Sequence, residues 1–333
     1  MPFNKFVSML LCICALAING LAQVSNSTQK EPLRVETYVN TDQALDMVSS
    51  LVIGNEAAMI IDLPITIGKA KELASWVKAT TDKPLAVAFT SHNHPDHYLG
   101  GAAFFEEFPG ILYYANSRSA NEIRIDAPMK TQEWSEVFGE DNIVQNASLP
   151  LTYDYSFFSL PGDEDSPVYL LEHLTGDTID ETMFWIPSIQ TLIAADTVWS
   201  RDLHIWMADL LTPALTESWI ATLDFIRSLQ PSLIIPGHSL SNTGLDGSQD
   251  LNHSYSYLTF WQKQIESRGP NYFTPREIYD RFDSAFPGLI RPNARFNRLN
   301  ITAENFGRGG KRIVHHQPLS SFNDSTVLDA WNF

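Results

Sequence analysis

Residues 90–101, with the sequence TSHNHPDHYLGG, constrain the fold more than any other part of the chain. They place His92, His94, Asp96 and His97 within six positions, directly after the apolar run LAVAF. A short apolar run of this kind is typical of a buried strand. Histidine and aspartate are common metal ligands, and their ordered spacing here exceeds what a turn requires. The stretch therefore predicts a metal site at the end of a buried strand.

The chain repeats one order of elements: strand, aspartate, helix, strand, histidine. In the first part, an expected hairpin ends at Asp62, a helix covers 67–79, and the strand LAVAFTS leads into the histidine motif. In the second part, the pair TMFWIP and TLIAAD ends at Asp196, a helix covers 216–229, and LIIPGHS ends at His238. The repeat predicts an α/β protein with two sheets packed face to face, helices outside and a shared edge of strand ends.

Further candidate ligands stand at the ends of the later apolar runs. His173 and Asp177 lie in LLEHLTGDT, Asp196 in IAADTVW and His238 in IPGHS. A catalytic metal needs ligands on rigid elements that converge and leave a coordination position open. Asp196, His238 and one of His173 and Asp177 are therefore expected to meet the histidine motif at one site.

This series of residues resembles the metallo-β-lactamase superfamily. The signature of that family is His-x-His-x-Asp-His, a GHT-like turn, an aspartate after an apolar strand and a late Gly-His. The resemblance covers about residues 45–240 and implies an αββα four-layer sandwich, in which two packed mixed β-sheets carry external helices.

The resemblance also implies a ligand set for two divalent metal ions. The implied metal ligands are His92, His94, Asp96, His97, Asp177, Asp196 and His238. His92 and His94 would hold the first ion, and Asp196 would bridge to the second. The metal is Zn²⁺ in the first instance, with Mn²⁺ or Fe²⁺ as alternatives. A metal-bound hydroxide would be the nucleophile, and Asp96 would orient that water or receive its proton.

The chain departs from the family at the third motif. It has Gly176-Asp177-Thr178 where the family has GHT. Alignment back from the strand TMFWIPS puts Asp177 at the place of the third first-site histidine, and Asp177 is the favoured ligand. His173, four residues earlier, is the alternative. A carboxylate at this place moves the preference toward harder metal ions.

Several residues near the motifs have two interpretations. Asp62 resembles the family's buried aspartate and is expected to hold a ligating histidine. His204 and Trp206 either line the substrate pocket or pack the loop after Asp196, and packing is favoured. His315 and His316 are expected in a solvated loop.

Residues 1–22 are predicted to be a secretory signal peptide, cleaved after Ala22. Both cysteines, Cys12 and Cys14, lie inside this segment. The mature chain would therefore contain no thiol, which excludes a cysteine nucleophile, a thiolate metal site and a disulfide. A membrane anchor, the alternative, needs about 20 continuous apolar residues, and Asn19 interrupts the run.

Five N-x-[ST] sequons are candidate glycosylation sites. They stand at Asn26, Asn146, Asn252, Asn300 and Asn323. Together with the signal peptide they predict a secreted, extracellular glycoprotein with no membrane contact after cleavage.

The mature chain, residues 23–333, is expected to be a single metallo-β-lactamase-like domain. Its metal-site core would span about 45–240, and a helical extension about 250–333. In that extension a helix is expected near 253–267, a second begins at the capping box TPRE, and a polar tail from about residue 300 would wrap the surface.

The net charge limits which partners the protein can bind. Removal of Lys5 with the leader leaves 21 basic residues against 39 acidic ones, a net charge of −18. Such a surface repels nucleic acids and anionic membranes, so a small-molecule substrate is expected.

The predicted function is a secreted metal-dependent hydrolase that opens an ester, lactone, lactam or thioester bond. The alternatives are a phosphodiester or sulfate ester hydrolase and a non-catalytic glycoprotein whose metal only holds the fold.

Overall fold

The computed structural model describes residues 30–242, 245, 247–290 and 297–311. All helices and strands of the described structure lie within Glu31–Phe333. The predicted signal peptide, the sequons at Asn26 and Asn323, and the pair His315 and His316 lie outside the described residues.

The strands fall into two groups along the chain. The first group comprises β1 (Arg34–Asn40), β2 (Met47–Ile53), β3 (Ala58–Ile61), β4 (Leu85–Phe89), β5 (Leu112–Ala115) and β6 (Leu151–Thr152). The second comprises β7 (Phe157–Phe158), β8 (Val168–Leu174), β9 (Glu181–Ile186), β10 (Thr191–Trp199) and β11 (Leu233–His238).

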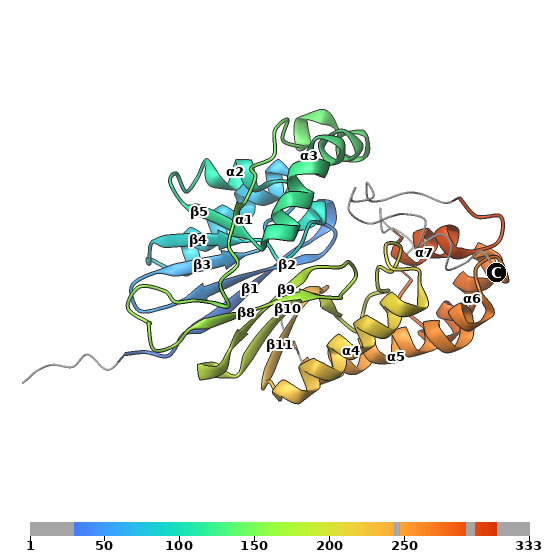
Figure 1. Cartoon of the computed structure of the whole chain (residues 1–333). Helices are drawn as coiled ribbons and strands as arrows, with labels where there is room; N and C mark the ends of the chain where they lie inside the picture. Colours follow the sequence, from blue (N-terminus) through green and yellow to red (C-terminus); the bar gives the residue numbers. More distant parts are fainter. Residues whose placement is uncertain (1–29, 243–244, 246, 291–296, 312–333) are drawn as a thin grey trace, which may run out of the picture. The chain divides into compact units, whose positions relative to one another are not determined.

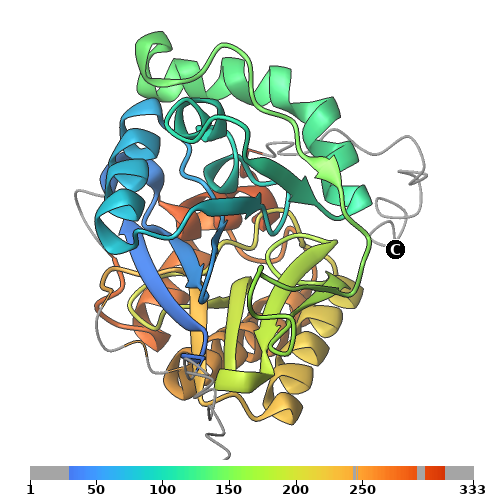
Figure 2. The same cartoon turned by 90° about the vertical axis from the view of Figure 1, so that its left-hand side faces the viewer.

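The helices follow the same division. With the first group of strands go α1 (Ile67–Thr80), α2 (Gly101–Phe105) and α3 (Ser117–Phe138). With the second go α4 (Pro213–Leu229), α5 (Gly247–Phe260), α6 (Pro275–Ala285) and α7 (Arg298–Phe306). Figures 1 and 2 show the first set of helices on one side of the strands and the second set on the other.

Each group of strands forms a mixed half-sheet, and one residue pair joins the two halves. The strand order is β6-β5-β4-β3-β2-β11-β10-β9-β8-β7, with β1 paired to β2. β3, β4, β5 and β6 run parallel, as do β10 and β11, whereas β2 pairs antiparallel with β3. The join is His238↔Met47, between β11 and β2. A predicted ligand therefore stands where the two half-sheets meet.

Three apolar clusters separate the four layers. One lies between α1–α3 and the first half-sheet, and another between α4–α7 and the second. The third joins the inner faces of both half-sheets. Alternation along β3 shows the division, because Met59 and Ile61 face the interlayer core whereas Ala58 and Ile60 face the helices. Both faces are covered, so these strands read as continuous apolar runs. The αββα layering predicted from the sequence is confirmed.

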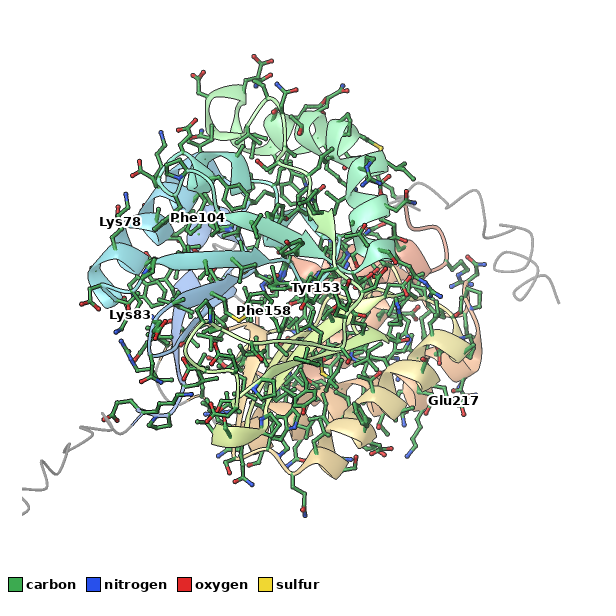
Figure 3. The ribbon with its side chains drawn as sticks, turned by 60° about the vertical axis from the view of Figure 1, so that its left-hand side comes forward. Lys78, Lys83, Phe104, Tyr153, Phe158 and Glu217 are labelled. Carbon is green, nitrogen blue, oxygen red and sulfur yellow. The ribbon has the colours of Figure 1, made fainter. Side chains whose placement is uncertain are left out.

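Aromatic side chains fill the interlayer core near the edge strands. The Phe89 ring lies 5.3 Å from that of Tyr153 and 5.7 Å from that of Phe158, both at near-perpendicular angles. Figure 3 shows Tyr153 and Phe158 in this position, while Lys78 of α1 and Glu217 of α4 point outward from the two helical layers. Edge-to-face contacts of this kind hold the half-sheets face to face.

The predicted elements agree closely with those observed. Both hairpins form, as β2–β3 and β9–β10, and the helices expected at 67–79 and 216–229 are α1 and α4. The capping box at Thr274 is present at the start of α6, where Thr274 and Glu277 exchange hydrogen bonds. No helix among the described residues is both long and apolar enough to cross a membrane.

The expected polar surface tail from about residue 300 is wrong for its first part. Residues Arg298–Phe306 form the helix α7, capped by Asn297, whose side chain accepts a hydrogen bond from the Asn300 amide. Leu299, Ala303 and Phe306 recur at helical spacing and are buried against the second helical layer. Polar residues separate these three apolar residues in the sequence, so the short apolar face of the helix was not recognised.

Candidate metal centre

Loops and strand ends from both half-sheets converge at their junction. His92 and His94 follow β4, and Asp96 and His97 belong to the short 3₁₀ turn Pro95–His97. The other three are Asp177 between β8 and β9, Asp196 in β10 and His238 at the end of β11. All seven predicted ligands are buried, and together they form two adjacent clusters.

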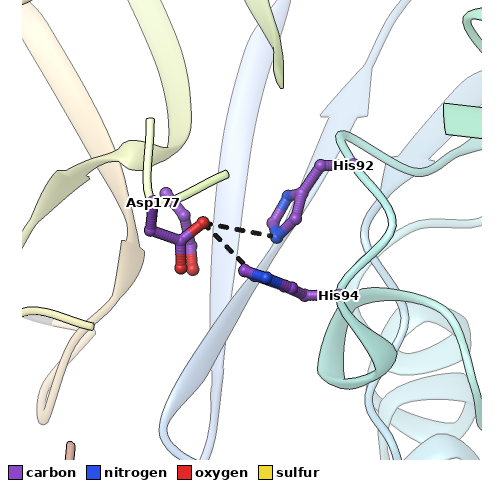
Figure 4. A group of neighbouring side chains, drawn as sticks. His92, His94 and Asp177 are labelled. Atoms are coloured by element: carbon purple, nitrogen blue, oxygen red, sulfur yellow. Dashed lines mark ion pairs between the residues drawn. The ribbon is translucent and has the colours of Figure 1, made fainter. Parts of the chain in front are cut away.

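The first cluster contains His92, His94, Asp177 and Asp196, whose ligand atoms lie within 4.8 Å of one another. Asp177 Oδ1 lies 3.2 Å from His94 Nδ1 and 3.9 Å from His92 Nε2. Figure 4 shows the two imidazoles facing this carboxylate. Asp177 thus lies beside both histidines of the first cluster.

The second cluster contains Asp96, His97 and His238. His238 Nε2 lies 3.4 Å from His97 Nε2 and 3.4 Å from Asp96 Oδ2. Two imidazole nitrogens and one carboxylate oxygen thus face a common centre, a donor set that suits a divalent transition metal.

Asp196 connects the two clusters. Its Oδ1 lies 3.4 Å from His97 Nε2 and its Oδ2 lies 3.2 Å from His238 Nε2, although the residue is also a member of the first cluster. Gly237 makes room for this carboxylate, because a Cβ at position 237 would lie 1.8 Å from Asp196 Oδ1. The glycine before His238 is therefore a steric requirement of the site. A carboxylate between two ligand groups has the position of a bridging ligand.

Buried polar atoms without partners test whether the residues fit a metal. His92 Nε2, Asp177 Oδ1 and Asp196 Oδ1 are fully buried and make no hydrogen bond of acceptable geometry to any described residue. Leaving such a group unsatisfied costs about 1–3 kcal/mol. All three atoms point into the clusters, where a cation would satisfy them together. The residues fit a dinuclear metal site.

The outward nitrogen of each histidine is held by a hydrogen bond. His94 Nε2 donates to Asp209 Oδ2 at 2.8 Å, His97 Nδ1 to Asp62 Oδ2 at 3.0 Å, and His238 Nδ1 to the Leu45 carbonyl at 2.9 Å. These bonds leave the inward nitrogen of each ring with its lone pair free to bind metal.

His92 is held through a serine. Its Nδ1 lies 2.8 Å from Ser91 Oγ, which donates to Asp62 Oδ2 at 2.9 Å. The Ser91 amide donates to the other oxygen of Asp62 at 2.7 Å. Asp62 therefore supports a ligand of each cluster: His92 through Ser91, and His97 directly.

The charges of the clusters repel one another in the metal-free protein. Burial, and next the charge of Asp196, raises the pKa of Asp177 well above its usual range. Burial and the charge of Asp177 do the same to the pKa of Glu181, whose side chain is fully buried beside His92. Burial, with His97 and His94 nearby, lowers the pKa of His92. Cations placed between these groups would relieve the repulsion among the carboxylates.

The structure does not bring His173 into either cluster. His173 has a left-handed backbone, with φ of 59°, and its Nδ1 lies 3.3 Å from Asp180 Oδ1 at the other side of the β8–β9 turn. Arg118 Nη1 donates to the same oxygen at 2.9 Å. His173 therefore belongs to a surface ion-pair group, and Asp177 takes the place in the first cluster.

The loop after β10 packs as the sequence favoured. His204 is buried with its Nδ1 at 3.2 Å from the Tyr257 hydroxyl, and burial lowers its pKa to about 4. Trp206 is buried in the helical layer, and its Nε1 donates to Asp209 Oδ2 at 2.8 Å. Sequence reasoning missed Asp209 and Glu181. Glu181 begins the strand β9 instead of ending one, and the apolar run before Asp209 forms no strand.

Comparisons with known proteins identify the family to which the sequence is similar. The family model described as the metallo-beta-lactamase superfamily matches residues 44–238. A linear primary-alkylsulfatase from Pseudomonas sp. is 23% identical over 223 residues, which is 59% of this chain and 42% of that protein. The chain thus matches less than half the length of this relative.

The solved structures to which the chain is similar include two metallo-β-lactamases. The one from Pontibacter korlensis is 19% identical, covers 71% of this chain and 100% of its own, and has a TM-score of 0.47. The DIM-1 metallo-β-lactamase exposed to ceftazidime is 17% identical, covers 69% of this chain and 96% of its own, and has a TM-score of 0.48.

The carboxylate of the first cluster gives a direct test of the ligand set. Asp177→Asn removes the charge while keeping the shape, so we expect the metal content to fall from two ions toward one. His173→Gln, the matched control outside the clusters, should keep the wild-type content. Mass spectrometry of metal-loaded, desalted protein measures both. The opposite pattern would mean that His173 is the ligand and that the arrangement around Asp177 is wrong.

Proposed function

Because this chain belongs to the metallo-β-lactamase superfamily, we propose that it is a hydrolase that uses two divalent metal ions, Zn²⁺ in the first instance, to cleave an ester-type bond in a small molecule. The observation that carries the proposal is the pair of clusters joined by Asp196. A structural metal site closes around one ion with four protein ligands, whereas seven candidate ligands converge here.

Solvent reaches the clusters from one side. His94 and Asp96 are 8% and 9% exposed, whereas the other five candidate ligands are 0–1% exposed. Water and substrate therefore approach over His94 and Asp96. An open side of this kind distinguishes a catalytic site from a structural one.

The chain's own groups have separate tasks in this reaction. When bound, the metal ions supply a water of lowered pKa and polarise the substrate oxygen that becomes negative. Asp96, on the open side, orients the attacking water and accepts its proton at a carboxylate oxygen. Asp209 accepts a hydrogen bond from His94, the other ligand on that side, and so fixes the orientation of its ring at the open side of the cluster.

The charge of the site favours an uncharged carbonyl substrate. Asp96, Asp177, Asp196, Glu181 and Asp209 bring five carboxyl groups to the clusters, against four positive charges on two divalent ions. No excess positive charge from these groups is then left to attract an anionic substrate. Carbonyl compounds, with esters and lactones the first to test, are therefore placed before the anionic sulfate and phosphate esters.

Alkyl sulfate esters are the second candidate. The observation that favours them is the similarity to a protein named as a linear primary-alkylsulfatase, over 59% of this chain. The same pair of metal ions can serve attack at sulfur or at phosphorus. A substrate panel separates these possibilities.

The panel compares aryl esters, γ- and δ-lactones, penicillins, thioesters, alkyl sulfates and phosphodiesters. We expect hydrolysis of at least one carbonyl class, loss of that activity on chelation, and recovery with Zn²⁺ or Mn²⁺. Asp96→Asn should lower kcat by about 10²- to 10⁴-fold, the usual contribution of a positioned acid or base. Asp180→Asn, a buried aspartate outside the clusters, is the matched control and should retain activity.

Two results would contradict the carbonyl assignment. Activity that survives complete metal removal would rule out the proposed chemistry. Cleavage of alkyl sulfates alone, with all carbonyl substrates inert, would select the second candidate.

We also propose that the protein is secreted and glycosylated. Of the five predicted sequons, Asn146, Asn252 and Asn300 lie in the described residues, and all three side chains are exposed. Exposure is what attachment of a glycan requires, so the geometry supports the proposal.

Expression in a eukaryotic host tests this assignment. The mature protein should begin at Gln23 and lose mass on treatment with an N-glycosidase, with the mass shift abolished in a variant carrying Asn→Gln at the sequons. N-terminal sequencing and intact mass spectrometry measure both. A chain that retains Met1 and carries no glycan would refute secretion.

A further inference from the structure

The helix α7 lies beside the second cluster although it is distant in sequence. It begins at Arg298, 60 residues after His238 and beyond the segment 44–238 that the family model matches. Leu299, Ala303 and Phe306 anchor the helix in the second helical layer, where the Phe306 ring lies 4.8 Å from that of Trp261. The helix is therefore firmly packed and can position a side chain.

Arg298 reaches the outward side of His238. The guanidinium is buried, with Arg298 6% exposed, and its Nη2 donates to the Leu45 carbonyl oxygen. The same Nη2 lies 3.2 Å from His238 Nδ1, which also donates to Leu45. Two donors, one from the ligand and one from α7, thus share a single acceptor.

Trp199 contacts both Arg298 and His238. The Arg298 guanidinium lies 5.0 Å from the centre of the Trp199 ring. Trp199 in turn stacks on His238 at 4.3 Å with an angle of 7° between the planes. Arg298 and His238 therefore both pack against Trp199 while they contact each other, and a planar guanidinium suits contact with a ring face better than an ammonium does.

The carbonyl that the two donors share comes from a strained backbone. Leu45 has φ of 60° and Asp46 has φ of 64°, in the left-handed region that non-glycine residues seldom adopt. Such a conformation persists only where its surroundings hold it. The bonds from Arg298 and His238 to the Leu45 oxygen supply that restraint.

A second contact joins α7 to the loop that serves the first cluster. The Met207 amide donates to Thr302 Oγ1 at 3.4 Å. This loop carries Asp209, which holds His94. The contact is longer than that of Arg298 and reaches the first cluster through several bonds, so the stronger effect is expected at the second.

We propose that Arg298 is a positioning residue of the second cluster, and that docking of α7 sets the affinity of Asp96, His97 and His238 for their metal ion. The inference rests on the proposed function, because it requires that the clusters bind metal. Without Arg298, the Leu45 carbonyl loses one of its two donors, and the stacked pair Trp199 and His238 loses a neighbour that packs against both. Loss of a group that orients a metal ligand typically lowers metal affinity about 10- to 100-fold.

The test titrates metal-free protein with Co²⁺ and follows the visible absorption of each site together with the bound stoichiometry. Wild type should bind two ions. In Arg298→Met the second ion should bind about 10- to 100-fold more weakly, with a changed spectrum, while the first keeps its affinity. Arg298→Lys keeps the charge but loses the planar guanidinium, and should weaken the second ion about 10-fold. The control Arg281→Met removes an exposed arginine that lies 4.2 Å from the Phe273 ring, remote from the clusters, and should change neither ion.

Amide hydrogen exchange gives a second test that does not depend on enzyme activity. If docking of α7 and binding of the second ion support each other, the ion must slow amide hydrogen exchange in Arg298–Phe306. This protection should be present in wild type and lost in Arg298→Met.

The outcomes distinguish failure of this inference from failure of the proposed function. Wild type that binds no metal contradicts the proposed function itself. Wild type that binds two ions, with variants that bind the second ion equally well, overturns the role of Arg298. Equal weakening of both ions in a folded Arg298→Met, or wild-type affinity in Arg298→Lys, also overturns it, since the role would then be general packing or charge.

Discussion

Both clusters depend on the hydrogen bonds that the carboxylate of Asp62 accepts. It accepts from His97 Nδ1, from the Ser91 hydroxyl and from the Ser91 amide, and the same hydroxyl lies against His92 Nδ1. One buried charge thus fixes a ligand of each cluster. Asp62 itself has φ of 65° and directly follows the strand β3, so its position is set by the edge of the first half-sheet. The position of the sheet edge therefore determines, through this one side chain, where a ligand of each cluster lies.

The second half-sheet also positions a ligand by hydrogen bonding, but with other acceptors. His238 is both the last residue of β11 and the residue that pairs with Met47 across the junction. Its outward nitrogen is held by the strained Leu45 backbone, and its ring by Trp199. Asp177 Oδ1 and Asp196 Oδ1 are buried without a hydrogen-bond partner among the described residues. The apolar layers on each side offset this cost, and bound cations would remove it.

Much of this arrangement could be predicted from the sequence because its signals are local. A buried strand followed by a His-x-His-x-Asp-His motif, and a later strand that ends in Gly-His, place five ligands at strand ends without knowledge of the fold. Asp177 and His173 were harder to separate, since both lie near the β8–β9 turn. His173 lies within the register shift between Leu171 and Leu174 and has a left-handed backbone, and spacing alone does not reveal such a shift. Asp209 and Arg298 could not be predicted, because their role depends on contacts across 115 and 60 positions of the chain.

The central claim is that the two clusters hold two metal ions on either side of Asp196. Anomalous diffraction from crystals of the metal-loaded protein, recorded on both sides of the absorption edge of the metal, tests it most directly. The account predicts two peaks about 3.5–4 Å apart, one against His92, His94 and Asp177 and the other against Asp96, His97 and His238. A single peak closed by four protein ligands, or none in crystals grown with excess metal, would contradict it.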